Sequence, residues 1–354
     1  MAFFKYTKTI LLVSIVALFI ISAINFIVDP LQIYPSVFSY NKKNTYKSLA
    51  EKIITSKYGL ITPKETNYNE FELKKSLLKY SNHTDCAIIG SSRSMQISSF
   101  RENSSLNKTC PSIINLAVSG ASLQEYIDLS KILTTYPHVK TIVFVIDPWS
   151  LVSEPAYQWE AYKYFFINTP ENNTDTLEKN SSTVSLLQNL FNYRYLMLSI
   201  NKIFQTSQFS DFEVAPFFDT TIGIEDNVIL PDGSTIPAIS ISNRGIINGI
   251  NSYQINDAVS YNQNALKLFS DLVVQLKKQF NIVFVMTPYH PKVWELNNQP
   301  IVKIMESVES EIHVLAKSLN IATFGSYNPA KAGCLDGEYY DSMHMKDSCT
   351  SKLK

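Results

Sequence analysis

Short runs of apolar residues recur along the chain from residue 86 onward, and most of them end at a turn residue. They cover Cys86–Gly90, Ile113–Val118, Thr141–Ile146, Ile282–Met286 and, more weakly, Ile321–Phe324. Apolar runs of this length that are rich in Val and Ile are typical of strands in a parallel sheet whose two faces are both covered. The pattern therefore predicts five buried strands.

Longer stretches with apolar residues at helical spacing separate these runs. They span Ser122–Leu133, Ala258–Phe280 and Val302–Leu319. Strands that alternate with helices form βαβ units. We therefore expect an α/β domain over residues 83–354, with a doubly wound, mostly parallel sheet.

Residues 150–257 interrupt this alternation and predict a helical insertion. They include an aromatic stretch with Tyr157 and Trp159, a helix from about Val184 to Phe204, and a polar loop around Asp232. Because the insertion follows the third strand, it should lie at the carboxyl edge of the sheet, where open α/β folds bind ligands. It either shapes a substrate cleft or forms a helical cap with no substrate role.

The N-terminal region contains an apolar run from Thr9 to Val28, long enough to cross a hydrocarbon core of ~30 Å. Lys5 and Lys8 precede it, which favours an N-terminus in the cytoplasm. We expect an uncleaved single-pass anchor over residues 1–28 in the inner membrane, a helical stalk over 29–82, and a C-terminal domain in the periplasm or outside the cell. A cleaved signal peptide, whose apolar region is usually shorter, and a buried core helix are the alternatives.

The charge balance excludes one class of partner. The chain has 31 Lys and Arg residues against 31 Asp and Glu residues, so no basic excess is present to bind nucleic acid electrostatically. The 20 Tyr and 20 Phe residues argue against a disordered chain, which contains few aromatic residues.

Four cysteines, Cys86, Cys110, Cys334 and Cys349, allow three disulfide pairings. The pairing that is local in sequence, Cys86–Cys110 with Cys334–Cys349, closes two short loops, and each bridge contributes ~3 kcal/mol in the loop-entropy picture. No Cys or His spacing is typical of zinc, so we expect no metal site. Disulfides fit an oxidising compartment outside the inner membrane.

A candidate nucleophile follows the first predicted strand, in Gly90-Ser91-Ser92-Arg93-Ser94. A tight turn there exposes a serine hydroxyl and directs backbone N–H groups towards the same point, where they can hold an oxyanion. The alternative is that Ser91 or Ser92 only caps a helix.

A serine nucleophile needs a base, usually a histidine oriented by a carboxylate. Asp341 and His344 form such a pair in a loop after the last strand, although a surface ion pair would have the same spacing. His290, in Thr287-Pro288-Tyr289-His290-Pro291, also follows a strand; it is a rival base, a substrate contact or an ordinary loop histidine.

Taken together, these motifs resemble the SGNH (GDSL-like) hydrolase family. More narrowly, the chain resembles the membrane-anchored branch that includes the alginate O-acetylation proteins and the D-alanine-transfer protein of teichoic-acid synthesis. The resemblance covers the chain outside the insertion. It is carried by residues 90–94, 115–120, 147–149, 287–291 and 341–344, and by Asp29-Pro30 after the apolar run.

The resemblance implies that Ser92 is the nucleophile, His344 the base and Asp341 its orienting carboxylate. The backbone N–H groups of Ser92 and Gly120 would form the oxyanion hole, and no cofactor would be needed. We expect the Cys334–Cys349 bridge to hold the loop that carries His344.

The chain departs from the family at Asp147-Pro148-Trp149, where an asparagine usually completes the oxyanion hole. A carboxylate cannot donate a hydrogen bond unless it is protonated. Either the hole has two donors only, or another donor such as Asn115 or Arg93 serves.

The expected function is that of a membrane-anchored esterase or O-acyltransferase acting on a cell-surface polysaccharide or glycan through an acyl-Ser92 intermediate. The partners would be this glycan, the inner membrane and a membrane acyl-donor protein. Predicted substrate contacts are Arg93, Asn115, Asp147, Trp149, Tyr289 and His290, while Trp149, Tyr157 and Trp159 either stack on sugar rings or pack in the core. The alternative function is a non-catalytic protein for surface-glycan binding or assembly, with a degenerate site.

Overall fold

The computed structural model describes residues 2–28, 39–62, 68–101, 105–153, 212–216, 226–239, 260–295 and 300–354, together with residues 190, 191, 196, 199 and 200. The chain divides into two compact units, each of which is described by itself. The first holds residues 1–48, 65–69 and 172–211; the second holds residues 49–64, 70–171 and 212–354.

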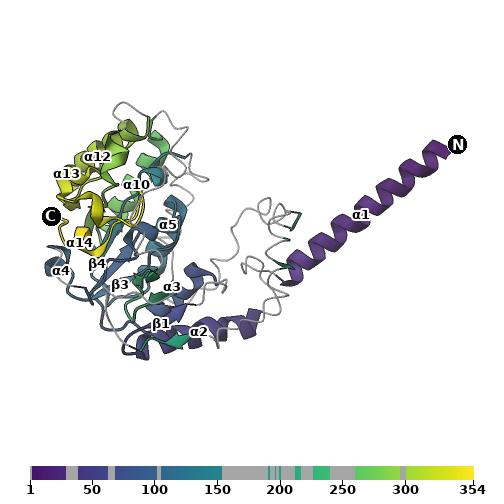
Figure 1. Cartoon of the computed structure of the whole chain (residues 1–354), viewed down its shortest axis with the longest axis horizontal. Helices are drawn as coiled ribbons and strands as arrows, with labels where there is room; N and C mark the ends of the chain where they lie inside the picture. The colour runs from purple at the N-terminus through teal and green to yellow at the C-terminus, as the bar shows by residue number, and fades with distance from the viewer. Residues whose placement is uncertain are drawn as a thin grey trace. The chain divides into compact units, whose positions relative to one another are not determined.

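The first unit contains α1 (Ala2–Val28), the N-terminal helix in Figure 1. Its segment Tyr6–Val28 is long and apolar enough to cross a membrane, and most of its large apolar side chains are exposed. Towards the end of the helix, the buried Asn25 side chain donates a hydrogen bond to the carbonyl oxygen of Leu190 and accepts one from the Ser199 hydroxyl. A signal sequence near the N-terminus can meet the same length and composition criterion.

The second unit is built on a sheet of five parallel strands. Their order in the sheet is β3 (Ile113–Asn115), β2 (Cys86–Ile89), β4 (Thr141–Val145), β8 (Asn281–Met286) and β9 (Ala322–Gly325). This confirms the five predicted strands and the α/β class. Counted along the chain, the order is 2-1-3-4-5, a doubly wound order whose ligand-binding crevice lies where the winding direction reverses, here between β2 and β4.

Both faces of the sheet are covered, which explains why its strands are almost continuously apolar. On one face, Phe269 of α10 (Gln263–Leu276) packs against Phe144 and Phe284, with ring centroids 5.4 and 5.7 Å apart. On the other face, Val143 and Val285 share a buried cluster with the C-terminal segment.

The predicted helices are present and have clear start signals. Helix α5 (Leu123–Leu133) begins with a capping box between Ser122 and Glu125, and α10 is capped by Asn262. Helix α12 (Pro300–Leu319) connects β8 to β9, and Figure 1 shows α5, α10 and α12 around the sheet. The short helices are α4 (Ser105–Thr109), α11 (Pro291–Trp294), α13 (Pro329–Ala332), α14 (Asp347–Thr350) and the 3₁₀ turns η1 (Ser92–Ser94), η2 (Pro148–Leu151) and η5 (Asp336–Glu338).

In the described part of the expected helical stalk, residues 39–62 and 68–82, the structure has a strand as well as helices. Helix α2 (Ser39–Thr55) is followed by the strand β1 (Leu60–Thr62) and by α3 (Glu70–Leu78), which buries Leu73 and Leu77 completely. β1 pairs antiparallel with β5 (Glu213–Val214) and β6 (Asn227–Ile229), and β7 (Thr235–Ile236) extends this small sheet. The partners of β1 lie far away in sequence, so no local pattern reveals it.

Parts of the predicted insertion therefore form strands. Its aromatic stretch with Tyr157 and Trp159, and most of the helix expected at 184–204, lie outside the described residues. The turn after β6 does reach the parallel sheet, because the Asp232 carbonyl oxygen accepts a hydrogen bond of 2.7 Å from the Asn115 backbone N–H at the end of β3.

Gly325 and Gly333 provide a matched test of this packing, since both have a φ of +75°. A Cβ atom at Gly325 would lie 2.3 Å from the Met286 carbonyl oxygen, whereas one at Gly333 would meet nothing within 4 Å. Gly333→Ala should cost about 1–2 kcal/mol for the left-handed backbone alone. Gly325→Ala should cost about 1–3 kcal/mol more because of the steric clash. Urea unfolding measures both, and equal losses would contradict the β8–β9 packing.

Candidate active site

The turn after β2 leaves the Ser92 hydroxyl available for chemistry. Ser91, not Ser92, caps η1, because its side chain accepts a hydrogen bond from the Arg93 backbone N–H. Glycine is required at position 90, where a Cβ atom would lie 2.4 Å from Ser94 Oγ and 2.9 Å from Val145 Cβ. The chain therefore turns tightly at the carboxyl end of β2, and Ser92 stays partly exposed.

Ser92, His344 and Asp341 form one hydrogen-bonded series. Ser92 Oγ lies 2.9 Å from His344 Nε2, and His344 Nδ1 lies 2.8 Å from Asp341 Oδ2. The serine and the histidine are 252 positions apart in the sequence. This is the geometry of a nucleophile, a base and an orienting carboxylate.

The Asp341 carboxylate is held in its ionised form. Burial alone would raise its pKa, but the His344 side chain and the backbone N–H groups of Met343 and His344 donate hydrogen bonds to it and lower the pKa to about 2. An ionised Asp341 accepts a hydrogen bond from His344 Nδ1–H, which leaves Nε2 as the acceptor that faces Ser92.

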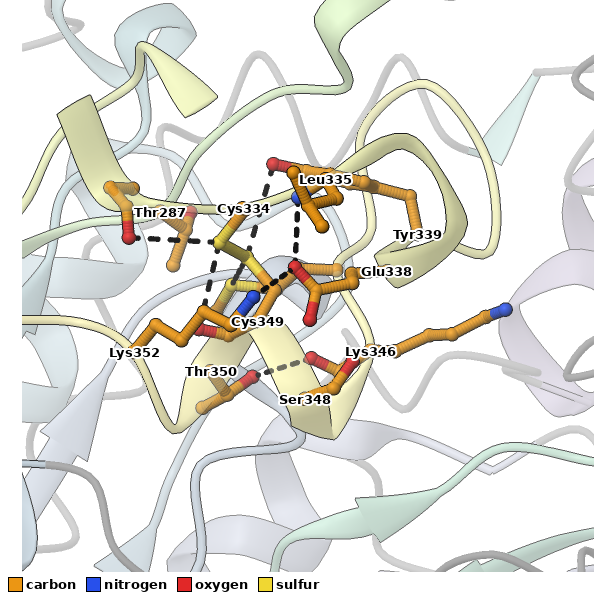
Figure 2. The surroundings of a disulfide bond; sticks show 12 residues. Thr287, Cys334, Leu335, Glu338, Tyr339, Lys346, Ser348, Cys349, Thr350 and Lys352 are labelled. Atoms are coloured by element: carbon orange, nitrogen blue, oxygen red, sulfur yellow. Dashed lines mark hydrogen bonds and ion pairs between the residues drawn. A yellow bond between two sulfur atoms is a disulfide. The ribbon is translucent and has the colours of Figure 1, made fainter. Parts of the chain in front are cut away.

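The loop that carries Asp341 and His344 lies between the two cysteines of the Cys334–Cys349 disulfide. Its base is closed by the bridge between Tyr339 and Met345, with a hydrogen bond from the Tyr340 N–H to the His344 carbonyl oxygen. Figure 2 shows the disulfide with Glu338, whose carboxylate accepts hydrogen bonds from the Leu335 N–H and from Lys352. The other disulfide joins Cys86 to Cys110. The structure therefore has the cysteine pairing that is local in sequence.

The loop that contains Gly120 lies against the Ser92 turn. The Val118 N–H donates to the Gly90 carbonyl oxygen over 3.0 Å, which brings the loop before α5 to the Ser92 turn. Gly120 in this loop has a φ of +65°, and the Trp149 indole N–H donates to the next carbonyl oxygen, that of Ala121. Within the described part of the chain, the N–H groups of Ser92 and Gly120 donate to no protein acceptor.

A carboxylate that the sequence interpretation missed supports this loop. Glu70, in the first turn of α3, accepts hydrogen bonds of 2.6 and 3.0 Å from the backbone N–H and the hydroxyl of Ser119. Glu70 lies in the segment that was expected to be a stalk, so the sequence offered no signal for this contact.

The predicted third donors are used elsewhere. The Asn115 side chain amide donates to the Ser94 and Ile97 carbonyl oxygens, so it holds the turn after Ser92 and is not free for an oxyanion. The Arg93 guanidinium is fully buried against Asp147, with 3.0 Å between Nη1 and Oδ1 and no side-chain exposure on either residue. Burial raises the pKa of the Asp147 carboxyl, and Arg93 opposes that shift.

The predicted substrate contacts do not line an open surface. Asn115, Arg93, Asp147, Trp149, Tyr289 and His290 are all buried. Their side chains pack against other protein groups, so a direct substrate contact by any of these six residues stays a prediction.

His290 makes structural hydrogen bonds, whereas His344 is the histidine that contacts Ser92. Its Nδ1 atom accepts a hydrogen bond from the Lys292 N–H and so caps α11, while its backbone N–H donates to the Ser342 carbonyl oxygen. Burial lowers its pKa, which favours the neutral ring. His290 thus fastens the loop after β8 to the loop that carries His344.

The site can supply a nucleophile, a base and an anion-binding turn from its own side chains and backbone. Among the residues that the structure describes, no cluster of three His, Cys, Asp or Glu side chains could hold a metal ion. Searches of protein-family models and of curated proteins find no match for this chain. What the site does therefore has to be inferred from its geometry.

The Asp341 carboxylate should make folding stability sensitive to acid. The pKa of Asp341 is about 2 in the folded chain and ~3.9 in an unfolded one. The ionised carboxylate therefore stabilises the fold above about pH 4, and this stabilisation is lost as the pH falls towards 2. Between pH 5 and pH 2.5, the free energy of unfolding measured in urea should fall less for Asp341→Asn than for the wild type. Asp271→Asn, at an exposed helical pair with Lys267, is the control and should follow the wild type. Parallel acid profiles for all three proteins would contradict the assignment.

Proposed function

We propose that this protein is a membrane-anchored serine esterase or O-acyltransferase of the SGNH type, acting on a cell-surface polysaccharide or glycan. The observation that carries the proposal is the series of hydrogen bonds from Ser92 through His344 to Asp341. Its members come from both ends of the domain, and a capping serine or a surface ion pair would not require that arrangement.

In the proposed reaction, His344 Nε2 accepts the Ser92 hydroxyl proton while Oγ attacks the acyl carbonyl carbon. The N–H groups of Ser92 and Gly120 hold the oxyanion, and Asp341 stabilises the imidazolium. His344 then returns the proton to the leaving oxygen, which yields acyl-Ser92. Water or a sugar hydroxyl, deprotonated by the same histidine, attacks this ester and releases Ser92.

The same site gives some support to a non-catalytic glycan-binding protein, because Asn115 and Arg93 are committed to structural hydrogen bonds. A missing oxyanion donor typically costs ~10²–10³ in rate. That loss still leaves catalysis far above the uncatalysed reaction, and the intact Ser92–His344–Asp341 series favours an enzyme.

The proposed location follows from α1 and the disulfides. As an uncleaved anchor in the inner membrane, α1 would hold the second unit on the periplasmic or outer side, where the two bridges form. A tether of this kind suits a glycan that is made or exported at the membrane, with the acyl group supplied by a membrane donor protein.

Labelling with a serine-directed fluorophosphonate tests the nucleophile. The wild type should be labelled and Ser92→Ala should not, because only an activated hydroxyl reacts. Ser318→Ala, at an exposed helical serine that bonds back to its own helix, is the matched control and should be labelled like the wild type. Labelling that persists in Ser92→Ala would overturn the assignment of Ser92, and no labelling of the wild type would favour the glycan-binding alternative.

Kinetics on a fluorogenic umbelliferyl acetate test the base. His344→Ala should lower kcat by about 10⁴–10⁶-fold with little change in KM, because the lost interaction acts in the transition state. His313→Ala, on an exposed face of α12, should retain the wild-type kcat. If both variants retained the wild-type kcat, His344 would not be the base.

A further inference from the structure

The residue after the proposed nucleophile is a buried arginine that contacts three separate segments. Arg93 Nη1 donates to Asp147 Oδ1 over 3.0 Å, and Nε donates to the Met343 carbonyl oxygen over 3.1 Å. Nη2 donates to the carbonyl oxygen of Thr287. These partners follow β4, β8 and β9 in the chain, so one guanidinium joins the Ser92 turn to all three.

We propose that Arg93 is a positioning residue that holds the His344 loop in register with Ser92, and that Asp147 fixes the guanidinium in the required orientation. This inference rests on the proposed function of Ser92 and His344. Arg93 is covalently adjacent to Ser92, and its acceptor Met343 is covalently adjacent to His344. The Nε bond therefore ties together the two peptide segments whose side chains meet at 2.9 Å.

Because Arg93 is buried, its hydrogen bond to the Met343 carbonyl oxygen restricts the position of the His344 loop. A guanidinium carries its donors in a rigid planar fork, and away from water each donor needs a protein acceptor. The Tyr289 ring lies 3.8 Å from the centre of the guanidinium and closes one of its faces. If the His344 loop moved away, Nε would lose its acceptor in a place that water does not reach, so other positions of the loop are disfavoured.

Asp147 has a matching role. Its Oδ1 atom faces Nη1, and its side chain has no exposed surface, so it acts as the counter-charge and not as a substrate contact. It occupies the block where the resemblance to SGNH hydrolases implies an oxyanion donor. The Asp147 carboxylate thus orients Arg93 and does not serve as an oxyanion donor.

The test compares the same substitution at two buried arginines. Arg93→Lys keeps the positive charge, but a single ammonium cannot serve three partners in the geometry of the fork. Arg101→Lys is the matched control, because Arg101 is also buried and donates to Gln96, Thr235 and Asp347, none of which is adjacent in sequence to Ser92, Asp341 or His344. Both full-length variants should show a lower Tm than the wild type.

Activity should separate the two variants. Arg93→Lys should lower kcat for umbelliferyl acetate by about 10- to 100-fold, the scale expected for a small misplacement of reacting groups, with KM within about twofold of the wild type. Its rate of fluorophosphonate labelling should fall by the same factor. Arg101→Lys should keep the wild-type kcat. If the two variants retained the same kcat, Arg93 would have a structural role only.

A spectroscopic readout keeps the positioning role separate from the catalytic one. The His344 Nδ1–H that faces Asp341 should give a downfield proton resonance in the wild type that is missing in His344→Ala. Arg93→Lys should shift or broaden it, and Arg101→Lys should not. An inactive wild type whose resonance responds to Arg93→Lys would overturn the function but support positioning. An active wild type whose resonance and kcat are unchanged by Arg93→Lys would support the function but overturn the positioning role.

If Arg93→Lys does not fold, Asp147→Asn replaces it, since the amide keeps the shape of the side chain and removes its charge. A folded Asp147→Asn with a lower kcat, an unchanged KM and a perturbed downfield resonance would support the proposal. A folded Asp147→Asn with wild-type kcat and resonance would overturn it.

Discussion

The register of the parallel sheet is the constraint on which the site depends. Ile89, Phe144, Phe284 and Thr323 form one row across β2, β4, β8 and β9. Three residues beyond this row, the four strands lead to Ser92, Asp147, Thr287 and Ser326. Because both faces of the sheet are buried, a slip of one residue would exchange the two faces of a strand. The hydrophobic core therefore also aligns the polar groups at the carboxyl edge.

At that edge, buried backbone carbonyl oxygens accept hydrogen bonds from long side chains. The carbonyl oxygens of Val145 and Ile146 accept hydrogen bonds of 2.7 and 2.8 Å from the hydroxyls of Tyr126 and Tyr327. The Arg93 guanidinium takes the carbonyl oxygen of Thr287. Buried carbonyl groups need partners, so the sheet edge becomes a rigid platform, at which Ser92 and His344 stay partly exposed.

Local patterns were sufficient to predict the five strands, the three long helices and the cysteine pairing. For Ser92, Asp341 and His344 the local motifs left alternatives open; the resemblance to SGNH hydrolases selected these three residues, which the structure brings together. They failed where the decisive partner is distant. The partner of β1 at Val214 is over 150 positions away, and Arg93 meets the Met343 carbonyl oxygen across 250 positions. A strand of three residues shows no measurable alternation, and the burial of a charge depends on its counter-charge. Both effects are invisible in a window of local sequence.

The Asp147 carboxylate and the burial of Arg93 form one physical feature. A buried guanidinium that faced a neutral amide would keep an uncompensated charge, and breaking a buried ion pair typically costs ~3–5 kcal/mol. Arg93, which follows Ser92, is accordingly paired with an anion at the end of β4. In the proposed enzyme the oxyanion hole would then have the backbone donors of Ser92 and Gly120 only, while the Arg93 Nε bond to the Met343 carbonyl oxygen ties the loop that carries His344 to the Ser92 turn. Under the proposed function, Asp147 would stabilise the alignment of Ser92 and His344 through Arg93, and it would not donate a hydrogen bond to the transition state.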